Sequence, residues 1–227
     1  NLPVLAVMTA RPTLLEWRPD WGAGQDFHTQ LRLPPLDKAD SRALAREILQ
    51  KVEPLPRPLR DLLVSRAEGN PYYMEEMVKM LLEDRVILKG KNRWTVEASR
   101  LNMVSVPPTL RGLLQARLDT LLYPERVTLQ RAAVIGRVFY DQALVALDSA
   151  DPMELREVTD ALASLLERGF IQRRESSAIP GAVEYVFVQG MVRDMIVESV
   201  LEEQRRAYYL SAAEWFIRAA SDRSDEY

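Results

Sequence analysis

The spacing of apolar residues separates a short strand-like N-terminal part from a long helical part. Residues 2–9, Leu-Pro-Val-Leu-Ala-Val-Met-Thr, are almost continuously apolar, which is typical of a parallel strand covered on both faces. Gln30–Leu33 alternates between polar and apolar residues and predicts a second short strand. Two strands do not make a stable sheet. We therefore expect residues 1–35 to be the end of an α/β core whose earlier strands belong to a longer protein.

From Leu36 onward the apolar positions recur at helical spacing. Asp37 is placed to cap a first helix, and the proline-rich segment 53–58 ends it. Helices over about 59–67 and 72–84 complete a three-helix unit. The helix at 72–84 should bury Tyr73, Met74, Met77, Val78, Leu81 and Leu82, whereas Glu75, Glu76, Lys79 and Glu83 should point away.

A helix end and a helix start are joined within three residues between the second and third helices. Gly69 suits the left-handed position just past a helix end. Asn70 is a good N-cap, and Pro71 fits the first helical position, where no backbone N–H is needed. This pattern is compatible with a structural joint between two helices and with a corner that contacts a nucleotide. The surrounding sequence has to distinguish these two interpretations.

The second half of the chain predicts further helices and two pairs of short strands. The expected strands lie at 86–88, 94–96, 170–174 and 184–188, and the expected helices at 110–121, 124–135, 139–147, 153–168, 191–201 and 203–220. Three helices followed by a β-hairpin is the order of a winged-helix domain. The last helix is rich in aromatic residues, so we expect it to pack on the preceding helix or to receive a further helical repeat.

Composition excludes several classes of site. There is no cysteine and His28 is the single histidine, so disulfides, thiol nucleophiles and multi-histidine metal sites are excluded, and a Ser-His-Asp triad is nearly so. No run of 18 apolar residues predicts a membrane span. The formal net charge of −3 disfavours a chain built mainly to bind nucleic acid. A cytoplasmic location is the expectation.

Several sequence blocks, in their order, resemble one known family. They are Thr-Ala-Arg-Pro, Glu-Gly-Asn-Pro-Tyr-Tyr-Met-Glu-Glu, Val-Pro-Pro-Thr-Leu-Arg-Gly-Leu-Leu-Gln-Ala-Arg-Leu-Asp, Leu-Gln-Arg-Ala-Ala-Val-Ile-Gly-Arg-Val-Phe and Leu-Glu-Arg-Gly-Phe-Ile. Over about residues 2–216 the chain resembles the C-terminal part of a bacterial STAND-type AAA+ ATPase module. Such modules follow a class III adenylate/guanylate cyclase domain or precede a LuxR-type or helical-repeat region.

The resemblance implies a mainly α fold with a remnant of a parallel α/β sheet at its N-terminus. Residues 1–35 would end the nucleotide-binding α/β core, and 36–100 would form a three-helix AAA+ lid. Residues 101–190 would form a winged-helix domain, and 191–227 would be C-terminal helices leading to a further region.

The resemblance also implies roles for individual residues. Arg11 matches the sensor arginine that approaches the terminal phosphate. Gly69 and Pro71 match the lid motif whose proline packs on the adenine ring. Gln189 stands where relatives commonly carry a histidine that reaches the bound diphosphate; glutamine can donate a hydrogen bond there but carries no charge. Tyr209 likewise stands where relatives often have histidine.

Two motifs needed for nucleotide chemistry do not occur in residues 1–227. There is no Gly-x-x-x-x-Gly-Lys-[Ser/Thr] loop to hold phosphates and no apolar strand ending in paired acids to hold magnesium. We therefore expect ATP or ADP and magnesium to bind only the intact protein, and this part to have no catalytic residues and no bound cofactor. The parent protein would be an ATPase and could also be a nucleotide cyclase. Effector and repeat domains of the same polypeptide are the expected partners.

Two other functions are weighed against this one. A winged-helix domain could bind DNA, but the exposed residues expected on its recognition helix are mostly acidic, which is unsuited to DNA phosphates. These residues are Glu154, Arg156, Glu157, Asp160, Glu167 and Arg168. The chain could instead be a protein-interaction scaffold that binds partners through its C-terminal helices.

Overall fold

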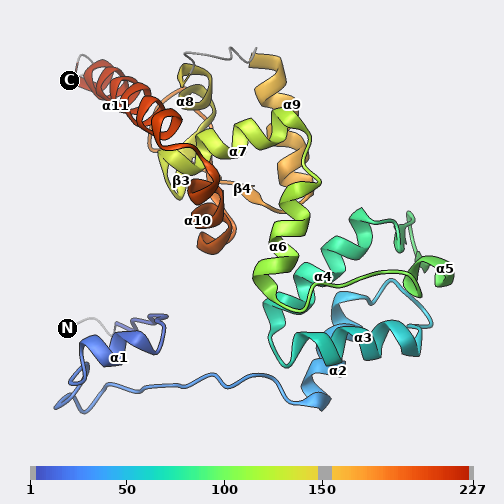
Figure 1. Cartoon of the computed structure of the whole chain (residues 1–227). Coiled ribbons are helices and arrows are strands. Elements are labelled where there is room, and N and C mark those ends of the chain that lie inside the picture. The colour runs from blue at the N-terminus through green and yellow to red at the C-terminus, as the bar shows by residue number, and fades with distance from the viewer. Residues whose placement is uncertain (1–3, 148–154, 225–227) are drawn as a thin grey trace. The chain divides into compact units, whose positions relative to one another are not determined.

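The computed structural model describes residues 4–147 and 155–224, and the chain divides into two units, Asn1–Pro35 and Leu36–Tyr227 (Figure 1). The chain is mainly α-helical, with two small antiparallel sheets in the second unit. Within the described ranges, none of the helices is both long enough and apolar enough to cross a membrane.

The N-terminal unit contains one short helix, α1 (Thr13–Trp17), and otherwise turns and extended chain. Both strand predictions are wrong over the described residues of this unit; Leu2 and Pro3 lie outside them. Val4 and Leu5 are 86% and 89% exposed, and no strand ladder pairs residues 4–35. The physical reason is that an apolar run becomes a strand only when a neighbouring strand satisfies its backbone groups. The predicted remnant of a parallel sheet is therefore absent from these residues.

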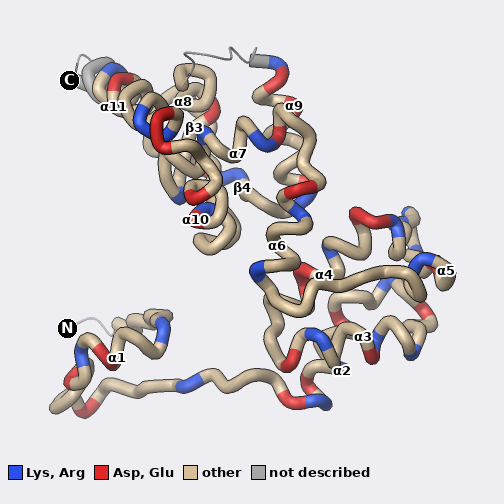
Figure 2. Tube along the Cα trace, viewed as in Figure 1, with Lys and Arg blue, Asp and Glu red and all other residues tan. Residues whose placement is uncertain are grey.

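The first half of the second unit consists of three helices and a hairpin. The helices are α2 (Lys38–Ile48), α3 (Arg57–Ala67) and α4 (Pro71–Glu83); the hairpin pairs β1 (Ile87–Lys89) with β2 (Trp94–Val96), and a short helix, α5 (Ala98–Leu101), follows. The predicted cap is confirmed, because the Asp37 carboxylate accepts hydrogen bonds from the backbone N–H groups of Ala39 and Asp40. Basic and acidic residues both occur along α2 and α3 (Figure 2).

A first hydrophobic core fills the space between these helices. Its fully enclosed members include Ala45, Leu59, Leu63, Met77 and Leu81. Leu113, from the helix α6 (Leu110–Asp119) in the second half of the unit, also belongs to this core. Trp94 is partly buried and packs against this core. This first core therefore holds the helices on either side of the Gly-Asn-Pro corner.

The second half alternates helices with three strands. Its elements are α6 (Leu110–Asp119), α7 (Tyr123–Ile135), β3 (Val138–Tyr140), α8 (Asp141–Ala146), α9 (Leu155–Glu167), β4 (Ile171–Arg173) and β5 (Glu184–Phe187). The strands form one antiparallel sheet in the order β3-β5-β4. Thr109 caps α6, and Gly136 is the C-cap residue of α7.

One helix prediction in this half needs correction. The helix expected at 139–147 begins only at Asp141, because residues 138–140 form β3. Val138, Phe139 and Tyr140 are β-branched or aromatic residues that favour a strand, and they pair with β5. The Phe139 ring stacks on Tyr185 across this pair, with the ring centroids 5.7 Å apart.

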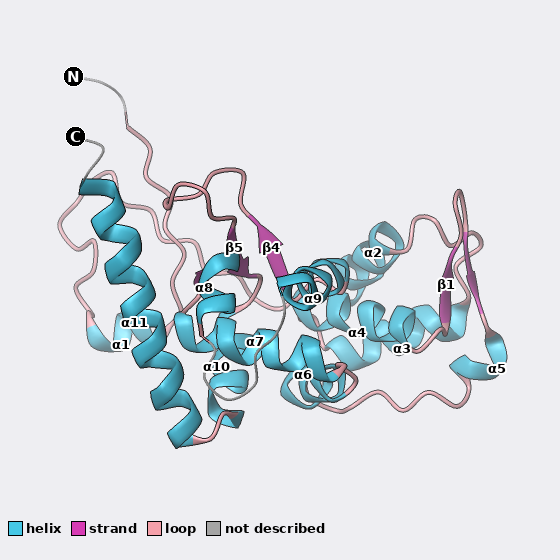
Figure 3. Ribbon diagram, turned by 90° about the horizontal axis from the view of Figure 1, so that it is seen from above, coloured by secondary structure: helices cyan, strands magenta, loops and turns pink. Residues whose placement is uncertain are grey.

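Two helices end the chain, α10 (Gly190–Ser199) and α11 (Glu202–Ser224). Helix α11 lies beside α7 and α8 (Figure 3). It buries Tyr208, Ala212 and Trp215 against them, and the Trp215 ring lies 5.6 Å from Tyr140. Tyr208 and Trp215, two of the aromatic residues of this helix, are therefore buried against the described part of the chain.

Candidate functional site

The Gly-Asn-Pro corner has the backbone that its sequence predicts. Glu68 and Gly69 are both left-handed, with φ of 48° and 79°. The Asn70 side chain accepts a hydrogen bond from the N–H of Tyr73 at 3.1 Å, and Pro71 is the first residue of α4. Gly69 is buried, and its carbonyl accepts from the N–H of Leu36 at 2.8 Å. The corner is therefore rigid inside, while Asn70 and Pro71 are exposed at its surface.

Two tyrosines just after the corner reach the second half of the unit. The Tyr73 hydroxyl donates a hydrogen bond to the carbonyl of Pro107, in the segment that leads into α6. Tyr72 packs on a second hydrophobic core, which Leu114 of α6 forms with residues of α7, α9 and the three-stranded sheet. Burial raises the pKa of Tyr72, and the negative charge of Glu76 adds to this effect. The start of α4 is thus fixed to both halves.

Two other residues singled out by the sequence lie elsewhere. Arg11 is an exposed residue of the N-terminal unit, directly before α1. Gln189 is the N-cap residue of α10; it is half-buried and its side chain makes no capping hydrogen bond. Among the described residues of the second unit, no hydrogen bond or ion pair connects Gln189 to Gly69 or Pro71. Within that unit, the structure therefore places Gly69 and Pro71 together at one corner and Gln189 elsewhere.

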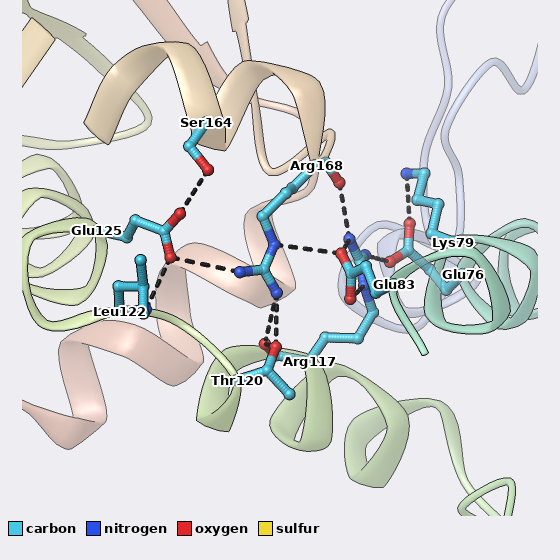
Figure 4. A network of polar contacts seen from close by, with 9 residues as sticks. All are labelled: Glu76, Lys79, Glu83, Arg117, Thr120, Leu122, Glu125, Ser164 and Arg168. Atoms are coloured by element: carbon cyan, nitrogen blue, oxygen red, sulfur yellow. Dashed lines mark hydrogen bonds and ion pairs between the residues drawn. The ribbon is translucent and has the colours of Figure 1, made fainter. Parts of the chain in front are cut away.

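A buried ion cluster lies between α4, α6 and the end of α9 (Figure 4). At its centre is Arg117, whose side chain is 1% exposed. Its Nε and Nη2 donate to the two carboxylate oxygens of Glu83 at 3.2 and 2.7 Å, and its Nη1 donates to Glu76. The remaining Nη2 proton is directed to the carbonyl of Arg168 at 2.7 Å. Lys79 completes this side of the cluster by donating to Glu76 at 2.6 Å.

Arg168 extends the cluster toward α7. Its Nε lies 3.3 Å from a Glu83 oxygen, and its Nη1 lies 3.3 Å from a Glu125 oxygen. Its Nη2 donates to the hydroxyl of Thr120 at 2.6 Å. Glu125 also accepts hydrogen bonds from the Ser164 hydroxyl and from the N–H of Leu122. The cluster therefore contains three carboxylates and three cations from four different helices and their ends.

The cluster corrects two predictions. Glu76 was expected to point into solvent but is 2% exposed, and Glu83 is directed into the same cluster. Arg168 was expected on an exposed recognition surface, but its side chain is only 17% exposed. In each case the opposite charge lies on a helix distant in sequence, so helical periodicity alone does not reveal the pairing. Arg117 itself lies among buried leucines of α6, which was the signal available in the sequence.

Aromatic packing and electrostatics hold Arg117 in its charged form. Its guanidinium lies 4.5 Å from the centroid of the Phe170 ring, and that of Arg168 lies 5.6 Å from it. Burial by itself lowers the pKa of Arg117, but hydrogen bonds and charges from Glu83 and Glu76 outweigh it, so the pKa is raised. Arg117 is thus a permanently charged member of the cluster.

Other candidate chemistry is limited. Within the described residues, no group of three or more His, Cys, Asp or Glu side chains is arranged to hold a metal ion. A shallow pocket at the tip of the β4–β5 hairpin is lined by residues of both charges, including Arg173, Arg174, Glu175 and Glu184. On α9, Arg156, Glu157, Asp160 and Glu167 are exposed as predicted, whereas Glu154 lies outside the described residues.

Searches for similarity to protein-family models and to curated proteins find no match for this chain.

Proposed function

We propose that this chain is the C-terminal part of a bacterial STAND-type AAA+ module that senses whether ATP or ADP is bound. It would couple that state to effector domains of the same cytoplasmic polypeptide, such as an adenylate/guanylate cyclase or a LuxR-type regulator. Residues 36–100 would be the helical lid and 101–190 the winged-helix domain.

The geometry of the Gly-Asn-Pro corner is the observation that carries this proposal. Gly69 and the Asn70 cap hold the first turn of α4 rigidly, and Pro71 is exposed on it. A proline ring is apolar and its backbone φ is fixed, so it can pack on an adenine ring with little loss of entropy. A proline in the first helical turn also suits a purely structural joint, so the proposal rests on the exposure of Pro71 beside this rigid corner.

The order of elements in the second half supports the winged-helix assignment. Helix α7 is followed by β3, α8, α9 and the β4–β5 hairpin, and β5 pairs with both other strands. Gln189 directly follows this hairpin, at the N-terminus of α10. Backbone N–H groups at a helix N-terminus attract anions, and the glutamine amide can donate a further hydrogen bond. Gln189 would therefore be the phosphate-sensing position.

The proposed mechanism is a shift between two populations. With diphosphate bound, Pro71 and Gln189 would hold the lid and the winged-helix domain against the nucleotide-binding core. With triphosphate bound, Arg11 would contact the terminal phosphate, and the lid and the winged-helix domain would be released from the core. A nucleotide-binding core encoded ahead of residue 1 would supply the phosphate-binding loop and the magnesium ligands. Residues 1–227 alone would not hydrolyse ATP; turnover that Arg11→Ala abolishes would contradict this.

The proposal is tested by measuring the affinity for ADP of the polypeptide that includes this upstream core. Pro71→Ala should weaken ADP binding in a calorimetric titration, because the adenine loses its apolar contact. Pro58→Ala is the matched control, since Pro58 is an exposed proline in the first turn of α3 and has no proposed nucleotide contact. Equal ADP affinity of the Pro71→Ala and Pro58→Ala variants would contradict the role of the corner.

A further inference from the structure

Helix α6 belongs to two hydrophobic cores at once. Leu113 is a member of the first core, formed with α2, α3 and α4. Its neighbour Leu114 is a member of the second core, formed with α7, α9 and the three-stranded sheet. Leu110, one turn earlier, packs on both. Because a single helix joins the two cores, rotation about this helix changes the angle between them unless other contacts prevent it.

Polar contacts also join the two halves. Glu83 of the first half is bonded to Arg168 of the second, and both are bonded to Arg117 of the shared helix. Lys79 lies beside the turn after α9, where a Cβ added to Gly169 would be 3.3 Å from its Nζ. Tyr72 is the principal apolar contribution of α4 to the second core. The ion cluster therefore joins α4 of the first half to the end of α9 of the second half, both directly and through Arg117 of α6.

Ionic contacts of this kind fix an angle more sharply than apolar packing does. The hydrophobic effect is non-directional, so apolar burial does not by itself select one angle between the two cores. The planar guanidinium of Arg117 instead requires both oxygens of Glu83 within hydrogen-bonding distance. Moving the halves apart would break the ion pair between Glu83 and Arg168 at a site that is mostly closed to water.

We propose that the Glu83–Arg117–Arg168 cluster is an ionic clamp that sets the angle between the two hydrophobic cores. Its function is conformational: both cores fold by their own apolar packing, and the clamp selects one arrangement of the two. This inference depends on the geometry of the second unit and not on nucleotide binding. It therefore holds or fails independently of the proposed function.

Arg168 is the suitable residue to remove. It is the partly accessible cation of the clamp, whereas Arg117 is fully enclosed and its loss would disturb the packing of α6 itself. Arg168→Met retains a long apolar side chain but removes the bonds to Glu83, Glu125 and Thr120. Arg111→Met is the matched control, because Arg111 also makes an ion pair from α6, with Glu198, but both side chains are more than 60% exposed.

Distances between spin labels in the two halves test the clamp. The chain has no cysteine, so Ala43→Cys on α2 and Ala163→Cys on α9, both exposed, give one specific label pair. Pulsed electron paramagnetic resonance on the labelled full chain should give one narrow distance distribution, unchanged by Arg111→Met. Arg168→Met should broaden it and add a second population, while the far-ultraviolet circular dichroism stays that of the parent.

Glu83→Gln is the second variant, because it breaks the same clamp from α4 if Arg168→Met does not fold. It should broaden the same distribution. A distribution as narrow as that of the parent in a folded Arg168→Met or Glu83→Gln variant would overturn the proposal. It would show that α6 and Tyr72 alone hold the angle.

Discussion

The guanidinium of Arg117 and the carboxylate of Glu83 form a two-point ion pair, with Nη2 and Oε1 2.7 Å apart, between helices α6 and α4. Thirty-four positions separate the two residues in sequence. The pair lies between a core that holds the Gly-Asn-Pro corner and a core that holds the three-stranded sheet. The ion pair is therefore placed to transmit a movement of the Gly-Asn-Pro corner to the second core.

Replacement of Arg117 by methionine should destabilise the chain strongly. Glu76 is buried and would keep only Lys79 as a partner, and Glu83 would keep only Arg168. Loss of one partner of a buried ion pair typically costs about 3–5 kcal/mol. Urea denaturation should show this loss for Arg117→Met and a loss of about 1 kcal/mol or less for the exposed Arg111→Met. Equal effects of the two variants would contradict the assigned importance of burial.

Gly69→Ala should destabilise the corner because of the backbone conformation alone. Gly69 has φ of 79°, where an alanine costs about 1–2 kcal/mol. Gly190 is the matched control, since it lies in the first turn of α10 and an added Cβ would meet nothing within 4 Å. The melting temperature should fall for Gly69→Ala and stay level or rise for Gly190→Ala. The opposite order would contradict the left-handed assignment at Gly69.

Asn70→Ala should remove the cap of α4. The lost hydrogen bond to the N–H of Tyr73 predicts a decrease of about 1 kcal/mol in the free energy of unfolding. Asn70→Asp should retain most of that stability, because a carboxylate accepts the same bond and is favoured at a helix N-terminus. Chemical denaturation of both variants checks this. An Asn70→Ala variant as stable as the parent would show that the cap contributes nothing.

Glu184 should make the stability of the chain depend on pH in the acid range. The N–H of Ala178 and the guanidinium of Arg174 bond its buried carboxylate and hold its pKa below its ordinary value of 4.5. A depressed pKa in the folded state contributes stability above the unfolded pKa, and this contribution is lost as the pH falls through the folded pKa. Glu184→Gln should therefore be less stable than the parent at pH 7.

The difference between Glu184→Gln and the parent should shrink steadily below pH 4.5 in thermal melts. Asp84 provides a contrast, because burial raises its pKa and the repulsion of Glu83 adds to this. Its contribution has the opposite sign, so Asp84→Asn should gain stability relative to the parent at pH 7. A constant difference for Glu184→Gln across the acid range would contradict the assigned hydrogen bonds.

Local signals in the sequence predicted the helices well, and the failures have physical causes. Asp37, Asn70, Thr109 and Gly136 act within one turn of their own helix, so the sequence alone was sufficient to place those helix ends. A strand depends on its neighbour instead. Residues 4–9 are apolar but unpaired, whereas 138–140 became a strand because β5 lies beside them.

The candidate site could be predicted only in part from the sequence, because some of its contacts join residues that are distant in sequence. The corner could be predicted because its glycine, cap and proline are adjacent. The ion cluster could not, because Glu76 and Arg117 are 41 positions apart and helical periodicity assigns an isolated glutamate to solvent. Only the packing of α4 on α6 shows that this charge is buried.

Hydrogen–deuterium exchange, with and without ADP, tests the central claim most directly. It would be measured on the polypeptide that contains residues 1–227 together with the upstream nucleotide-binding core. Saturating ADP should protect the amides of residues 68–75 and of Gln189, and Pro71→Ala should reduce that protection at matched ADP concentration. Bound ADP that leaves the exchange of residues 68–75 unchanged would contradict the claim that the corner senses nucleotide.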